Sequence, residues 1–62
     1  MKLISVQSRG NRLVIIEAFE DSFQVIGKEM FKNCFASRFF YQTMIEKSAL
    51  QAAENWLKGA KI

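Results

Sequence analysis

The chain has 62 residues, half of them hydrophobic, and it contains neither proline nor histidine. This length leaves room for one core, so we expect a single small domain over residues 1–62. Cys34 is the only cysteine, which excludes an intrachain disulfide, and without histidine the usual zinc sites cannot form. Nine Lys and Arg residues against six Asp and Glu residues give a formal net charge of +3, which favours anionic partners.

The longer N-terminal part of the chain predicts an antiparallel meander of three to four strands. Short runs of β-branched and aromatic residues, which suit a pleated sheet, alternate with clusters of Gly, Asn, Asp and Ser that favour tight turns. The predicted strands cover residues 3–7, 12–19, 23–31 and 34–42. Inside the third of them, Gly27 indicates a β-bulge or a close backbone approach.

A single amphipathic helix is predicted from about Thr43, where good helix formers begin and apolar residues recur at three- and four-residue spacing. Two capping boxes compete for its start, Thr43 with Glu46 and Ser48 with Gln51, and we favour Ser48. Gly59 is expected to end the helix. The side chains expected to pack on the sheet are Ala49, Leu50, Ala52, Ala53, Trp56 and Leu57. The predicted fold class is therefore α+β.

A two-residue turn at Glu20–Asp21 decides which side chains share a face, because alternate residues of a strand point to opposite faces. One face is then wholly apolar and consists of Val14, Ile16, Ala18, Phe23 and Val25. The other face is mixed and holds Leu13, Ile15, Glu17, Phe19, Gln24 and Ile26. One helix can cover only one face, so the second face needs a partner, and we expect a two-fold homodimer.

The residue types that usually carry catalysis are missing. Without histidine the chain has no common general base near neutral pH and no Ser-His or Cys-His nucleophile. Glu17, Glu20 and Asp21 are most simply read as strand and turn residues, and Cys34 as a tolerated thiol. We therefore expect no enzyme, no catalytic residue, no cofactor and no metal.

The lone thiol fits a cytoplasmic protein, as does a start that lacks the apolar stretch and cleavage site of a secretory signal. No apolar run approaches the roughly 18 residues needed to cross a membrane. We expect a small non-enzymatic protein that acts through protein–protein contacts. A regulator or inhibitor of a larger assembly is the favoured role, and the small size fits a phage or a mobile element.

The alternative is a single-stranded nucleic-acid-binding protein, in which rings on a sheet face stack on bases and basic side chains meet phosphates. The candidate binding surface consists of Arg12, Lys28, Lys32, Arg38 and Tyr41. Phe39 and Phe40 point to opposite faces by alternation, so at most one of them can join Tyr41 in a stacking platform.

Overall fold

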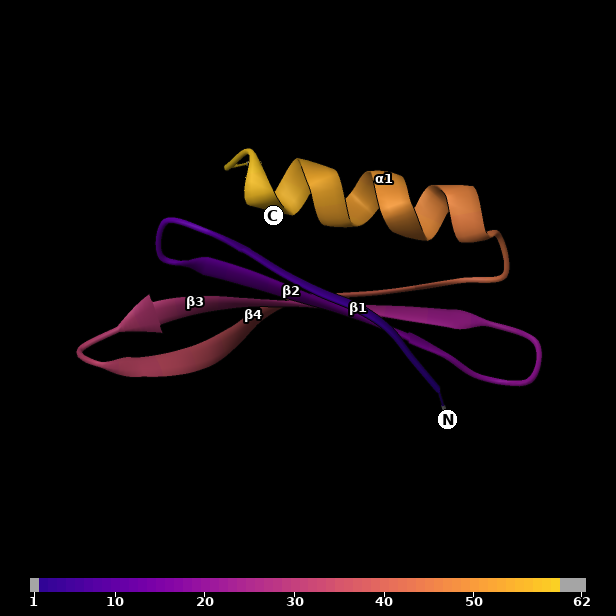
Figure 1. Ribbon diagram of the computed structural model, residues 1–62, viewed down its shortest axis with the longest axis horizontal. Helices are drawn as coiled ribbons and strands as arrows, with labels where there is room; N and C mark the ends of the chain where they lie inside the picture. The colour runs from indigo at the N-terminus through magenta and orange to yellow at the C-terminus, as the bar shows by residue number, and fades with distance from the viewer. Residues whose placement is uncertain (1, 60–62) are drawn as a thin grey trace.

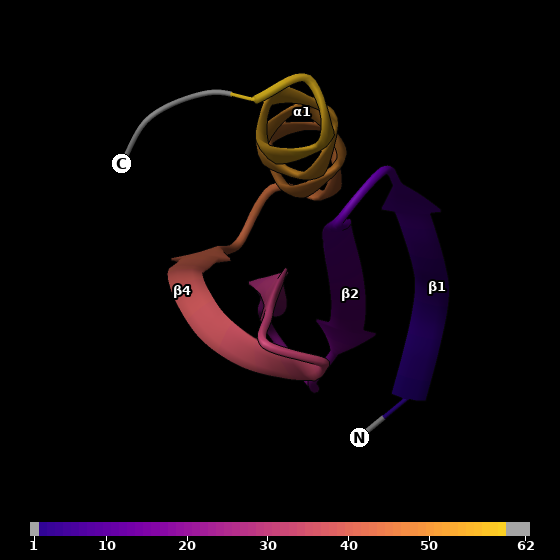
Figure 2. The same ribbon diagram turned by 90° about the vertical axis from the view of Figure 1, so that its left-hand side faces the viewer.

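The structure is a computed structural model and describes residues 2–59. Its elements are β1 (Lys2–Arg9), β2 (Arg12–Ala18), β3 (Phe23–Phe31), β4 (Cys34–Thr43) and α1 (Glu46–Leu57). The strands form one antiparallel sheet in the order β1-β2-β3-β4, and α1 lies across one face of it (Figure 1). Viewed from the end, the sheet is twisted and the helix stands on one side only (Figure 2). The predicted α+β meander with one C-terminal helix is confirmed.

Tight turns connect the strands where the sequence favours them. The β2–β3 connection is the predicted two-residue turn, since the Phe19 N–H donates to the Ser22 carbonyl at 2.8 Å across Glu20–Asp21. In the β3–β4 turn both central residues, Lys32 and Asn33, have positive φ, as a two-residue hairpin turn requires.

The register places the predicted apolar set under the helix. Ile16 pairs with Val25, and Ala18 pairs with Phe23. The fully or nearly buried core residues are Val14, Ile16, Val25, Ala49, Ala53 and Trp56. Ile4 packs against this core at an irregularity in the β1 register, where the chain has one extra residue between Leu3 and Ser5.

Gly27 lies directly beneath the Trp56 indole, so the close approach predicted there is present, whereas the bulge lies in the neighbouring strand. A Cβ built on Gly27 would lie 2.8 Å from two indole carbons of Trp56 and 3.0 Å from the Phe39 Cβ. The β3–β4 register also shifts at this residue, because Gly27 pairs with Phe39 while Lys28 pairs with Ser37. Arg38 is therefore the extra residue of a β-bulge in β4.

The helix begins at Glu46, so the favoured start at Ser48 is wrong. Neither capping box forms: the N-cap is Ile45 without a side-chain cap, and the Ile45 N–H donates to the Thr43 hydroxyl at 3.1 Å. The buried Ala49 explains the difference, because its packing on the sheet requires helix in the turn before it. Packing therefore outweighs capping here.

Two further expectations for the helix have opposite outcomes. Leu50 was expected to fill the layer between helix and sheet, but half of it is exposed, because it lies on the solvent side one residue after Ala49. Gly59 ends the helix as expected: its φ is +94°, and its N–H donates to the Trp56 carbonyl at 3.1 Å. Within residues 2–59, no helix is long and apolar enough to cross a membrane.

Candidate binding surfaces

The sheet face turned away from α1, here called the outer face, carries an apolar row across all four strands. The register aligns Val6 with Ile15, Ile15 with Ile26 and Ile26 with Phe40. These four residues are called the central row. Val6 is 51% exposed and Phe40 is 60% exposed, so the two ends of the row lie open to solvent.

Two polar rows flank the central row, one on each side along the strands. The basic row consists of Ser8, Leu13, Lys28 and Ser37. The acidic row consists of Leu3, Glu17, Gln24 and Gln42. Each row therefore presents one charged side chain, and the two charges have opposite sign.

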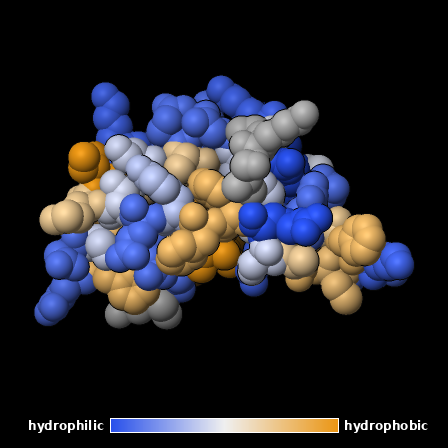
Figure 3. Space-filling view, turned by 180° about the vertical axis from the view of Figure 1, so that it is seen from behind, coloured by the Kyte–Doolittle hydropathy of each residue, from blue (hydrophilic) through white to orange (hydrophobic). Residues whose placement is uncertain are grey.

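Beyond the basic row, β3 and β4 continue as a two-stranded arm in which residues 30–38 are all exposed. Met30 pairs with Phe35 on its outer face, and both side chains are more than two fifths exposed. Seen from behind, apolar side chains gather below the helix and again along the arm at the right of the view (Figure 3). The arm extends beyond the end of the helix (Figure 1).

Charge is divided between the two ends of the sheet. The end with the arm and the C-terminus of α1 holds six basic residues and two acidic ones, a net charge of +4. These residues are Arg9, Arg12, Lys28, Glu29, Lys32, Arg38, Glu54 and Lys58. The opposite end, with the β2–β3 turn and the start of α1, has a net charge of −2 from Lys2, Glu17, Glu20, Asp21, Glu46 and Lys47. The described part of the chain is thus electrically polarised along the strands.

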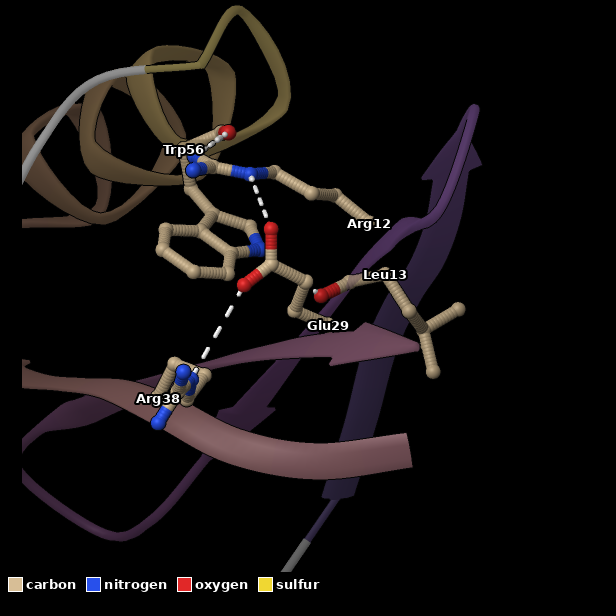
Figure 4. A network of polar contacts seen from close by, with 5 residues as sticks. All are labelled: Arg12, Leu13, Glu29, Arg38 and Trp56. Atoms are coloured by element: carbon tan, nitrogen blue, oxygen red, sulfur yellow. Dashed lines mark hydrogen bonds and ion pairs between the residues drawn. The ribbon is translucent and has the colours of Figure 1, made fainter. Parts of the chain in front are cut away.

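Arg12 is committed to the fold. Its Nη1 donates to the Trp56 carbonyl at 2.9 Å, and its guanidinium lies 4.0 Å from the indole centroid. Glu29 lies between two arginines, 3.6 Å from Arg12 and 3.8 Å from Arg38 (Figure 4). The Trp56 Nε1 donates to the Leu13 carbonyl at 3.1 Å, which fixes the indole in this network.

The five residues predicted as one binding surface are not brought together on one face. Arg12 and Tyr41 lie on the helix side, where Tyr41 stacks on Phe39 at 6.5 Å between centroids. Lys28 lies in the basic row of the outer face. Lys32 is at the tip of the arm, 5.4 Å from the Phe31 ring centroid, and Arg38 is the bulge residue at its base. Lys32 and Arg38 therefore lie on the arm, Lys28 lies next to its base on the outer face, and the other two lie on the helix side.

Few groups in residues 2–59 carry unusual chemistry. No three His, Cys, Asp or Glu side chains of this region converge as a metal site, and the Cys34 thiol is exposed. A hydrogen bond and ion pair from Lys58, at 2.8 Å, hold the pKa of the Glu54 carboxyl below its usual value. This pair is a helix surface contact one turn apart, so it indicates no binding site.

Comparison with family models, with curated proteins and with solved structures gives no match. The function must therefore be inferred from the surfaces themselves. Sequence alternation had placed Leu13, Ile15 and Ile26 on the outer face, but it had not joined Val6 and Phe40 to them, because that step requires the register of β1 and β4.

Proposed function

We propose that this chain is a small non-enzymatic binding protein that acts through protein–protein contacts at its outer face, as a regulator or inhibitor of a larger assembly. The observation that carries the proposal is the central row, which is apolar across the whole width of the sheet and has no covering element in residues 2–59. Folded proteins seldom leave a contiguous apolar patch of this kind without a partner.

The size of the available free energy supports an interface. Val6 and Phe40 are at least half exposed, so burying the rest of each side chain contributes about 1 kcal/mol. Leu3, Met30 and Phe35 are exposed on the same face to a similar degree. Together these side chains offer several kcal/mol to a partner that covers the face, which offsets the cost of association in part, so the partner must add apolar side chains and complementary charges of its own.

Site-specific photo-crosslinking in the cells that produce the protein tests this function. A photoreactive phenylalanine analogue in place of Phe40 is expected to trap a protein partner. The matched control carries the same analogue in place of Leu50, which is 49% exposed against 60% for Phe40 but lies on the solvent side of α1. A Phe40 position that traps no protein, or no more than the Leu50 control, contradicts the proposal.

A second candidate function, nucleic-acid binding, is favoured by one specific observation, the concentration of charge at the arm end. Lys32 and the side chain of Arg38, which is 62% exposed, are available there to meet phosphates. Phe31 and Phe35 are exposed on the same arm and provide rings for stacking on unpaired bases. The candidate site for single-stranded nucleic acid is therefore the arm and not the sheet face.

Fluorescence anisotropy of labelled single-stranded DNA and RNA at low and physiological salt tests this candidate. Phosphate contacts predict binding that weakens steeply with salt, and Lys32→Gln combined with Arg38→Gln is expected to weaken it at least tenfold. Lys47→Gln, at the acidic end, is the matched control and is expected to have little effect. No binding at low salt, or equal losses in both variants, excludes the arm as a nucleic-acid site.

A further inference from the structure

We propose that a second copy of the chain covers the outer face, with a two-fold axis that lies in the interface along the central row. This inference rests on the proposed function: the second copy occupies the outer face of the free protein, and the larger assembly competes with it for the same face. The two sheets would pack face to face, about 10 Å apart, as the layers of a β-sandwich do.

The outer face has the order of side chains that such an axis requires. From the central row toward the arm lies the basic row with Lys28, and at the same distance on the other side lies the acidic row with Glu17. Glu17 lies two residues from Ile15 along β2, and Lys28 lies two residues from Ile26 along β3, on the opposite side of the central row. The two sides of the central row are thus alike in their apolar side chains and carry charges of opposite sign.

A two-fold rotation about the central row exchanges the two flanks. Ile15 and Ile26 then lie against the same residues of the second copy, and Lys28 of each copy lies over the row that holds the other copy's Glu17. The rotation also turns the basic arm of each copy toward the acidic Glu20–Asp21 turn of the other. Lys28 of each copy then faces Gln24 of the other copy and lies one strand spacing, about 4.8 Å, to the side of its Glu17, which is within reach of an ion pair. Each flank charge thus lies near a charge of opposite sign, as in other isologous interfaces with complementary surfaces.

The apolar ends of the face fit the same rotation. Phe19 follows Glu17 by two residues in the alternation of β2, and it is 38% exposed. Met30 and Phe35 occupy the corresponding position on the other side of the central row, two residues beyond Lys28. The axis thus brings Phe19 of one copy toward Met30 and Phe35 of the other, which removes the remaining large apolar side chains of this face from water.

A two-fold axis along the strands is the other simple way to pack the two outer faces, and it is electrostatically unfavourable. It would lay the arm end of one copy, with a net charge of +4, beside the same end of the other. It would also keep Lys28 of one copy about 13 Å along the strands from Glu17 of the other, so no ion pair would form. Charge complementarity therefore selects the axis along the central row.

The extent of the face sets the expected strength. Four strands about 4.8 Å apart form a face roughly 19 Å wide, which places the contact at the small end of specific interfaces. We therefore expect a dimer with a dissociation constant in the micromolar range rather than a permanent one. Lys28 and Glu17 are separated by four residues along the strands, about 13 Å, so they do not pair within one copy.

Charge reversal followed by sedimentation velocity tests the proposal. Lys28→Glu and Glu17→Lys each replace two attractive contacts by two repulsive ones and are expected to weaken self-association at least tenfold. A one-to-one mixture of the two variants is expected to restore it, because each reversed side chain then meets an opposite charge on the other copy. A far-ultraviolet circular dichroism spectrum and a cooperative melt like those of the wild type show that each variant is folded, so a failure to associate is not due to unfolding.

Two results would overturn the dimer. One is a wild-type chain that stays monomeric up to millimolar concentration, and the other is a mixture that associates no better than the separate variants. Failure of the dimer is distinguishable from failure of the proposed function: if the wild type is monomeric but the Phe40 position still traps a different protein in cells, the outer face is a protein interface with another partner. If neither is observed, both proposals fall.

Discussion

Replacing Gly27 by alanine tests how tightly α1 is packed on the sheet. The new Cβ would lie 2.8 Å from two carbons of the Trp56 indole, closer than van der Waals contact allows. The indole cannot easily move aside, because it stacks on Phe39 at 5.7 Å and donates to the Leu13 carbonyl. The φ of Gly27 is not positive, so backbone strain adds nothing to the cost.

The expected destabilisation follows from two opposing effects. Overpacking of a core costs about 1–3 kcal/mol, whereas replacing glycine at a compatible backbone angle stabilises by roughly 0.4–1 kcal/mol through the unfolded state. The net loss is about 1–2 kcal/mol. At roughly 4–8 °C per kcal/mol for a domain of this size, Gly27→Ala is expected to lower the Tm by about 10 °C.

Thermal melts followed by far-ultraviolet circular dichroism measure this effect, with Trp56→Leu as the second member of a double-mutant cycle. Because leucine lacks the ring carbons that meet the new Cβ, Gly27→Ala is expected to cost little in that background. Gly10→Ala is the matched control, since nothing lies within 4 Å of a Cβ there and its cost comes from a φ of +60°. Equal losses for Gly27→Ala in both backgrounds would refute the reasoning.

The same packing supports three further predictions. Trp56→Ala is expected to lower the free energy of unfolding by about 3–5 kcal/mol, the usual loss for a buried aromatic side chain, so that the variant is unfolded at 25 °C and shows no cooperative melt. Leu57→Asp is expected to act in the same direction, and an unshifted thermal transition in either variant would contradict the packing. Arg12→Met should lower the free energy of unfolding by about 1–2 kcal/mol, because it removes the hydrogen bond to the Trp56 carbonyl, the contact with the Trp56 ring and one of the two ion pairs of Glu29. Urea denaturation that finds no loss would show that the network is dispensable. Lys58→Met should raise the pKa of Glu54 toward its ordinary value, which an NMR titration of the carboxyl group measures. Since folding lowers this pKa in the wild type, the contribution of the Lys58–Glu54 pair to stability is present above pH 4.5 and is lost as the pH falls through the folded pKa.

Much of the fold was predictable because the turns are explicit in the sequence. The two-residue turn at Glu20–Asp21 fixes the pairing of β2 with β3, and with it the entire apolar face under the helix. Gly27 was predictable as a special position for a related reason, since a glycine inside a strand of large residues needs a cause. In both places a preference of the local sequence, for a tight turn or for glycine, indicated a contact between residues that are distant in the chain.

The outer face was only partly predictable, because the bulge at Arg38 changes the parity of β4. Counting back from the Lys32–Asn33 turn without a bulge would pair Ile26 with Phe39, whereas the structure pairs Ile26 with Phe40. One extra residue thus moves Phe40 into the central row and Phe39 beneath the helix. No local sequence signal marks this bulge.

The candidate binding residues were predicted less well than the fold, because basic residues look alike in a sequence until their neighbours are known. Arg12 reads as an available cation, yet it is held between the Trp56 ring and Glu29, which are distant in the chain. Lys28, Lys32 and Arg38 belong to one hairpin, β3 and β4, so their proximity could be predicted from the sequence. The polarisation of charge along the strands required the complete strand order.

The most direct test of the central claim, that the outer face binds a second copy along the central row, is isotope-filtered NMR on an equal mixture of labelled and unlabelled protein. The claim predicts intermolecular contacts from the methyl groups of Ile15 and Ile26 to the same row of the second copy, and from Phe19 to Met30 or Phe35. It predicts none from Leu50, on the solvent side of α1. Intermolecular contacts confined to the helix, or their complete absence at millimolar concentration, would contradict it.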